Sequence, residues 1–272
     1  MIQGKGDIGG EFLSDARRAW GDVFEMACLP EQHKEEARQS DKTVVLAFDA
    51  KELGLYTSND FVSEYVKTDP SRLIGFCSVD PKRPDACSEL MRSYHELDLK
   101  GLKLGPIYQM FDPSDKICYP LYSKAEELNM PILWHMATSF PRSGPLDYCN
   151  PVLLDPIARS FPRLKMVIAH LGHPWHAEAA CVIRKQPNVY CDMSALWMRP
   201  WQFYNAMVNI VEYRVTHKVI FGTDFPFGHV QETIDAFRDI NKIVEGTNLP
   251  RIPEQDIEDI IHRNSLELLG IG

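Results

Sequence analysis

The sequence predicts an α/β fold of the (β/α)8 TIM-barrel type that lacks its first strand. Short apolar runs, often β-branched, alternate with stretches of helical periodicity along a chain of 272 residues. Near-continuous apolar runs are typical of strands buried on both faces of a parallel sheet, and a repeated strand and helix imply right-handed crossovers. No glycine-rich phosphate loop follows an early strand, and this disfavours an open doubly wound sheet.

Seven apolar runs are predicted as strands, and they span residues 43–50, 72–79, 101–105, 131–137, 165–172, 188–195 and 218–225. A closed barrel of this type has eight strands. The first 42 residues contain helical material at 11–20 and 29–39 but no convincing strand. The strand that is missing is therefore the first one.

Amphipathic stretches between these runs predict helices at 85–97, 121–129 and 254–270. The apolar stripe of the first of these consists of Leu90, Met91, Tyr94 and Leu97. Pro253 precedes the last helix and Gly270 ends it, which are favourable positions for these residues. No stretch reads as a linker, so residues 1–272 are predicted to form a single barrel domain.

The bulk composition excludes several classes of partner. A net charge of −9 and a pI near 5.5 argue against binding to nucleic acid or to an anionic membrane. No apolar stretch is long enough to span a bilayer, and the first residues lack the apolar region of a signal peptide. The seven cysteines are scattered and never form a C-x-x-C pair. We therefore expect a cytoplasmic protein with reduced thiols.

Polar residues at the ends of the apolar runs are the candidates for chemistry, because the carboxyl ends of parallel barrel strands meet at one mouth. His135, His170 and Asp224 end three different runs. Two imidazoles and a carboxylate suit a divalent metal site or a hydrolytic acid/base site. Taken singly, each histidine could be a hydrogen-bonded structural residue, and Asp224 could cap a turn.

Two further residues on the predicted strands are ionisable. Lys103 could pair with a carboxylate inside the mouth and contact the substrate, or it could extend outward to solvent. Asp192 is expected to be a structural hydrogen-bond acceptor.

The segment MVIAHLGHPWH holds three histidines, but Gly172 and Pro174 prevent them from sharing one helical face. His170 ends the predicted strand, and His173 lies in the loop above it within reach of a substrate. His176 is expected to be a solvated residue in the first turn of the next helix. Other residues in the loops after 165–172 and 188–195 could line a pocket or simply pack: Trp175, Trp197, Arg199 and Trp201.

Five segments resemble the amidohydrolase superfamily: ILWHMATSF, VIAHLGHPW, VYCDMSA, IFGTDFP and IIHRNSLELLGI. They are most similar to the branch that contains aminocarboxymuconate-semialdehyde decarboxylase and related aromatic-acid decarboxylases. The resemblance extends from about Phe12 to the C-terminus. It implies that His135 and Asp224 are metal ligands, that Asp224 also handles protons, and that His170 is an acid/base. The implied metal is divalent, usually zinc, and it lowers the pKa of a bound water.

One part of the family pattern is absent. The family begins with a His-x-His pair at the end of the first strand, whereas here no two histidines are two residues apart. The resemblance therefore implies an incomplete ligand set, weak metal binding and a chain that begins after strand one. The runs at 43–50 and 218–225 would be left with unpaired edges.

Three hypotheses follow. The first is a metal-dependent hydrolase that acts on a small carboxylated or cyclic substrate. The second is a non-oxidative carboxy-lyase that acts on an aromatic or muconate-like acid. The third is a catalytically impaired barrel that serves as a binding module. The expected partner is a small-molecule substrate, and the resemblance also implies a homodimer.

Overall fold

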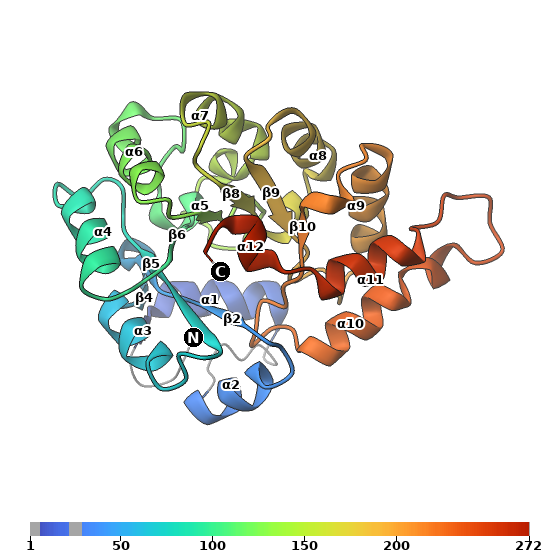
Figure 1. Cartoon of the computed structure of the whole chain (residues 1–272), viewed down its shortest axis with the longest axis horizontal. Coiled ribbons are helices and arrows are strands. Elements are labelled where there is room, and N and C mark those ends of the chain that lie inside the picture. Colours follow the sequence, from blue (N-terminus) through green and yellow to red (C-terminus); the bar gives the residue numbers. More distant parts are fainter. Residues whose placement is uncertain (1–5, 22–28, 272) are drawn as a thin grey trace.

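The computed structural model describes residues 6–21 and 29–271, which form a curled parallel β-sheet surrounded by helices (Figure 1). The sheet order is β10-β9-β8-β7-β6-β5-β2, and every neighbouring pair is parallel. Its strands are β2 (Thr43–Leu46), β5 (Leu73–Ser78), β6 (Gly101–Leu104), β7 (Ile132–Trp134), β8 (Met166–Ile168), β9 (Val189–Asp192) and β10 (Val219–Ile220). Each lies within a predicted run, and the α/β barrel that lacks one strand is confirmed.

The helices of the described residues follow the predicted rhythm. They are α1 (Gly10–Trp20), α2 (Pro30–Ala37), α3 (Asn59–Val66), α4 (Ala86–His95), α5 (Pro106–Gln109), α6 (Tyr119–Glu127), α7 (Leu154–Ser160), α8 (His176–Lys185), α9 (Pro200–Glu212), α10 (Val230–Arg238), α11 (Glu254–His262) and α12 (Ser265–Leu269). None of them is both long and apolar enough to cross a membrane.

Two details of the predicted helices are wrong. The helix expected at 254–270 is two helices, because the backbone becomes extended at Arg263 and the Asn264 side chain then accepts from Glu267 N to begin α12. Met91 is exposed although the predicted stripe includes it, whereas the other three residues of the stripe, Leu90, Tyr94 and Leu97, pack in or against the core.

The first 42 residues do contain a strand, although it is not part of the barrel. Strand β1 (Gly6–Ile8) pairs with β4 (Leu55–Thr57), which also pairs with β3 (Phe48–Ala50), in a small antiparallel sheet. The predicted run at 43–50 is thereby divided between the two sheets. The backbones of Gly54 and Gly9 lie very close together. A glycine is required at position 54, because its φ is +73° and a Cβ there would lie 2.5 Å from Gly9 Cα. Residues 1–5 and 22–28 lie outside the described part of the chain.

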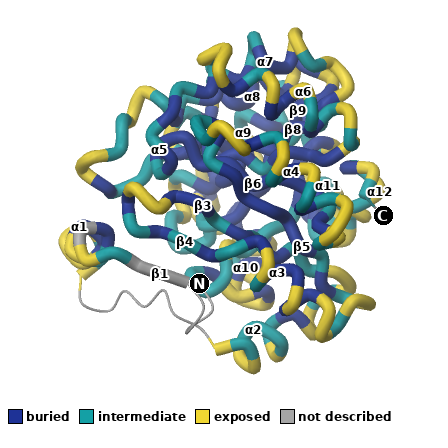
Figure 2. Tube along the Cα trace, turned by 90° about the vertical axis from the view of Figure 1, so that its left-hand side faces the viewer, coloured by how far each residue is buried: buried dark blue, intermediate teal, exposed yellow. Residues whose placement is uncertain are grey.

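The buried apolar residues form three clusters, of which one joins α1 to the small antiparallel sheet through Phe12, Ala50 and Leu55. Ile132 and Trp134 of β7 face the surrounding helices and belong to the main buried cluster, as the alternation of a strand requires. Leu133 between them faces the barrel interior, where Leu269 of α12 closes the lower end. Figure 2 shows the buried strands at the centre and the exposed residues concentrated on helices and loops.

Helix α2 spans the open side of the sheet, between α3 and the start of α10 (Figure 1). On one side, His33 Nδ1 lies 2.7 Å from the Tyr65 hydroxyl of α3. On the other, Glu36 accepts from Val230 N at 2.5 Å and from His229 Nδ1 at 2.9 Å. A carboxylate is favourable at this position because the first N–H groups of α10 have no partner within the helix. Helix α2 therefore ties the two sides of the opening together, through His33 on one side and Glu36 on the other.

We expect Glu36→Ala to lower the free energy of unfolding by about 1–3 kcal/mol, because both hydrogen bonds are lost at a largely buried carboxylate. Urea denaturation measures the change. Glu35→Ala is the matched control, because Glu35 is exposed and pairs only with Arg38 on the surface. Its effect should stay within about 0.5 kcal/mol. Equal effects of the two substitutions would contradict the bridging role of Glu36.

Candidate active site

The carboxyl ends of β6 to β9 bring four ionisable residues to the mouth of the barrel. Lys103 lies in β6 and Asp192 ends β9. His135 follows β7 directly, and His170 lies two residues after the end of β8. All four are buried. The parallel strands therefore place the two predicted histidines, the lysine and the aspartate in one region.

Asp192 organises the backbone beside it. Its Oδ1 accepts from His170 N at 3.0 Å, from Ser194 N at 3.0 Å and from the Ser194 hydroxyl at 2.5 Å. His170 has a left-handed backbone, with φ 58° and ψ 33°. Such a conformation costs a non-glycine residue about 1–2 kcal/mol, and the bond to Asp192 helps to hold it. The structural role predicted for Asp192 agrees with this geometry.

The hydrogen bonds at Asp192 also determine which ring nitrogens of His170 and His135 carry a proton. The Ser194 hydroxyl donates to Asp192, so Ser194 Oγ accepts from His170 Nδ1 at 2.7 Å. His170 Nε2 is then an acceptor and faces His135 Nδ1 at 3.3 Å. These assignments follow from the network rather than from observed hydrogens. We call this chain of Asp192, Ser194, His170 and His135 the proton relay.

The relay ends in an unpaired nitrogen. Among the described residues His135 Nε2 has no hydrogen-bond partner, although the atom is buried. Burial, followed by the charges of His170 and Lys103, holds the pKa of His135 well below its usual range. A neutral His135 that donates through Nδ1 therefore presents a bare lone pair on Nε2.

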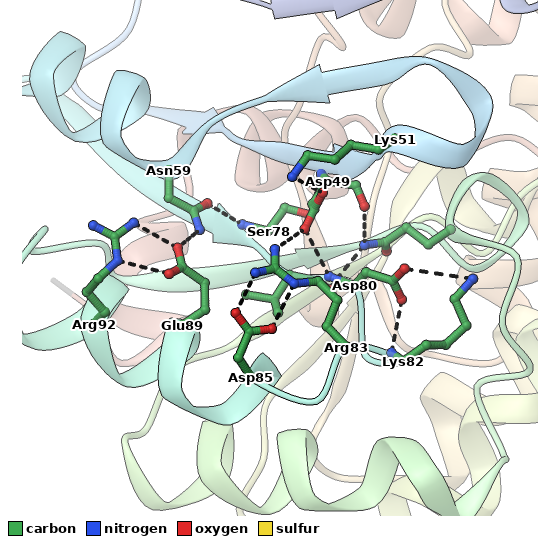
Figure 3. A network of polar contacts seen from close by, with 12 residues as sticks. Asp49, Lys51, Asn59, Ser78, Asp80, Lys82, Arg83, Asp85, Glu89 and Arg92 are labelled. Carbon is green, nitrogen blue, oxygen red and sulfur yellow. Dashed lines mark hydrogen bonds and ion pairs between the residues drawn. The ribbon is translucent and has the colours of Figure 1, made fainter.

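Lys103 is buried at the mouth rather than extended outward. Burial lowers the pKa of Lys103 to about 8, and the charges of Asp192 and Asp224 oppose this shift. The Ser78 hydroxyl of β5 donates to Lys103 O at 2.9 Å and holds the backbone of Lys103. Ser78 itself belongs to a polar network with Asn59 and the charged residues beside it (Figure 3). Asn59 in turn accepts from Ser78 N at 2.9 Å, which ties this strand end to α3.

Asp224 differs from expectation. It was expected at the end of a buried strand, but β10 ends at Ile220 and Asp224 lies exposed in the following loop, with φ 65°. The reason is that the backbone has already left the sheet, so the side chain is not forced into the interior. Its charge still raises the pKa values of Lys103 and Arg199, which places it at the rim of the mouth.

The other two histidines of the cluster form a second pair. His176 is buried, so the solvated position expected for it is wrong. Its Nδ1 faces Leu171 O at 3.1 Å, and its Nε2 lies 3.4 Å from His173 Nδ1 and 3.3 Å from Gln202 Oε1. The short loop folds back over the start of α8, and this covers the ring. His173 is half-buried, and burial lowers its pKa to about 4. Trp175 is also half-buried.

Some site residues were not singled out from the sequence. Ser194 joins Asp192 to His170, and Tyr108 packs its ring against His135 with centroids 4.7 Å apart. Spacing could have suggested Ser194, because a serine two residues after an aspartate often closes a local turn. Nothing in the periodicity shows where Tyr108 lies.

Helix α1 lies over the mouth. Phe12 packs on the Tyr108 ring at 6.4 Å between centroids, and Asp15 accepts from Arg142 N at 2.8 Å. At the other end, Trp20 covers the Arg199 guanidinium. The amphipathic pattern predicts this helix but not the surface that it covers.

The metal ligands implied by the resemblance are only partly assembled. In the described part of the chain, no group of three or more His, Cys, Asp or Glu side chains is arranged to hold a metal ion. The bare His135 Nε2 fits a ligand, but Asp224 is exposed at the rim. These residues alone therefore do not complete a metal site.

Comparisons with known proteins give a consistent picture. A family model described as Amidohydrolase matches residues 15–271. The 2-amino-3-carboxymuconate-6-semialdehyde decarboxylase of Dictyostelium discoideum is 23% identical over 260 residues, which cover 82% of this chain and 68% of that protein.

Solved structures share the fold. An uncharacterised TIM-barrel protein from Bordetella bronchiseptica has a TM-score of 0.70 and 23% identity, with 89% of this chain and 82% of that chain covered. A second similar structure is a dihydroxybenzoic acid decarboxylase from Polaromonas, solved with manganese and the inhibitor 2-nitroresorcinol. Its TM-score is 0.67 and its identity 17%, with 97% of this chain and 94% of that chain covered.

We expect Ser194→Ala to break the relay between Asp192 and His170. The free energy of unfolding should fall by about 1 kcal/mol, and the His170 ring should become a mixture of its two neutral tautomers. Nitrogen NMR of the ring atoms measures the second effect. Ser139→Ala removes a comparable hydroxyl, bonded to Tyr108 at 2.6 Å, and should leave the tautomer unchanged. A single unchanged tautomer in Ser194→Ala would contradict the relay.

Stability should also fall as the pH falls below about 6.5. In the unfolded chain an imidazole takes up its proton near this pH, whereas burial lowers the pKa of folded His173 to about 4 and also lowers that of His176. The unfolded state therefore binds more protons between these values, and acid favours unfolding. Urea titrations from pH 8 to pH 5 measure the free energy of unfolding. Compared with the wild type, its pH dependence should be weaker in His173→Gln and unaltered in His95→Gln, where the residue is exposed. An unaltered dependence in His173→Gln would contradict the prediction.

Proposed function

Because this chain belongs to the amidohydrolase family, we propose that it is a non-oxidative carboxy-lyase that removes carbon dioxide from a small aromatic or muconate-like acid. The sequence placed a metal-dependent hydrolase first and this activity second. The named decarboxylases among the similar proteins favour the second.

The proton relay is the observation that carries the proposal. Decarboxylation of an aromatic acid adds a proton to the ring carbon, breaks its bond to the carboxylate and releases carbon dioxide. A group that delivers this proton must hold it beside the substrate. His170 is suited to this role in its protonated form, in which Nε2 carries the proton instead of accepting one from His135. Ser194 connects the ring to the Asp192 carboxylate and so stabilises this positive charge.

The other residues of the mouth bind and orient the acid. Lys103, with a pKa of about 8, carries a positive charge at neutral pH and attracts the carboxylate. The Tyr108 ring against His135 provides an apolar wall for the substrate ring. His173 and Trp175 are the further candidates for substrate contact in the loop after β8.

A divalent metal is part of the proposal by analogy with the manganese of the Polaromonas enzyme. When bound, such an ion stabilises negative charge that develops on the substrate. His135 is the described residue whose free nitrogen best fits a ligand, and Asp224 would have to move inward to join it. No step proposed here passes through the metal, because the described ligands are incomplete.

The test is carbon dioxide release from a panel of hydroxybenzoates, with added Mn²⁺, with added Zn²⁺ and with a chelator. We expect release from at least one acid, and a loss of about 10²-fold or more in His170→Asn, because general acid catalysis contributes about that much. His217→Asn is the matched control, because His217 is exposed beside β10.

Three other outcomes would contradict the proposal. Opening of a lactone without carbon dioxide release would favour the hydrolase. Binding of the acids without any turnover would favour the impaired barrel. Undiminished release by His170→Asn would remove His170 from the acid role.

A further inference from the structure

Arg199 is a half-buried cation at the mouth whose guanidinium forms no ion pair with a described carboxylate. It precedes α9 directly, and its Nη1 donates to Ala195 O at 2.8 Å. The Trp20 ring lies over the guanidinium, with 4.8 Å between Cζ and the ring centroid. An arginine has five N–H donors, and this geometry uses one of them. An edge of the guanidinium is therefore available to a ligand.

Helix α1 holds this arrangement over the mouth. It has 11 residues, which at the usual rise per residue extend about 15 Å. Phe12 near its start packs on Tyr108, and Tyr108 packs on His135. Trp20 at its end packs on Arg199. The helix thus connects the end of the proton relay with the free cation.

The charges around Arg199 favour an anionic ligand. The chain carries a net charge of −9, so an anion needs a local positive region to bind. Lys103 and Arg199 supply it, and both feel the charge of Asp224. His173, which also feels Arg199, is neutral at physiological pH because burial lowers its pKa to about 4. Asp224 is exposed and does not neutralise Arg199 by direct contact.

We propose that Arg199 binds a carboxylate of the ligand and that Trp20 positions its guanidinium for that bond. The Trp20 ring lies over the guanidinium, and an arginine binds a carboxylate through two parallel hydrogen bonds from N–H groups at the edge of its plane. Helix α1 is then part of the ligand site although it precedes the sheet in the sequence. The inference rests on the proposed function only in taking the ligand to be a carboxylic acid.

The test compares two probes of nearly the same shape, benzoate and neutral benzamide, by calorimetric titration. The wild-type chain should bind benzoate more tightly than benzamide. Arg199→Gln should weaken benzoate binding about tenfold or more, the usual effect of losing hydrogen bonds to a charged group, and should leave benzamide binding unchanged. Arg199→Lys keeps the charge but lacks the planar edge. Its affinity for benzoate should lie between those of the wild type and Arg199→Gln.

Two further variants test the role of Trp20. Trp20→Leu should weaken benzoate binding less than Arg199→Gln does, because the cation remains but its plane is no longer held. Trp20→Phe should restore most of the affinity, because a ring again covers the guanidinium. Arg184→Gln is the matched control: Arg184 is exposed in the last turn of α8, at the opposite end of that helix from His176, and lies over the Tyr213 ring at 5.4 Å. Thermal unfolding of each variant checks that the chain is folded.

The outcomes separate this inference from the proposed function. Benzoate binding that is unchanged in Arg199→Gln, or an equal loss of benzamide binding, overturns the inference even if the chain releases carbon dioxide. An effect limited to benzoate supports it even if no acid is decarboxylated. Equal affinities of Trp20→Leu and the wild type would overturn the positioning role of Trp20.

Discussion

The Asp192 carboxylate is the constraint on which the mouth of the barrel depends. A buried carboxylate is tolerated only when hydrogen bonds replace its water, and Asp192 receives two backbone N–H groups and one hydroxyl on a single oxygen. The same bonds hold the left-handed backbone of His170 and set the direction of every proton as far as His135. Backbone shape, ring orientation and protonation are therefore coupled, and a change at Asp192 would alter all three together.

Helices cover the places where the sheet is open. Helix α2 connects the two sides of the opening, because His33 contacts α3 and Glu36 accepts from the start of α10. Helix α1 covers the mouth by aromatic contacts at Phe12 and Trp20. Apolar side chains of α12 fill the lower end of the barrel interior. Each contact is local, so the described chain maintains a barrel-like interior by covering its openings rather than by continuing the hydrogen-bonded ladder around them.

The sequence predicts those parts of the site that follow from strand periodicity. His135 and His170 were expected at strand ends and lie one and two residues beyond them, because an apolar run in a parallel barrel leaves little choice of position for the residues that follow it. Asp224 and His176 were placed wrongly, because both lie beyond a strand end, where the path of the loop determines burial. Ser194 and Arg199 have roles that depend on partners from other segments. A local pattern does not contain that information.

How well the sequence predicts the position of a site residue also depends on the strand that precedes that residue. The proton relay lies on β7, β8 and β9, and each of these strands is paired on both sides. Asp224 follows β10, which among the described residues pairs with β9 alone, through Val219 and Ile220. A strand with hydrogen bonds to one neighbour is short here, and the loop that follows it can lie at the surface. The relay is therefore held by strands with two neighbours, whereas Asp224 follows a strand with one described neighbour. This difference explains why the histidines are assembled while the metal ligands are not.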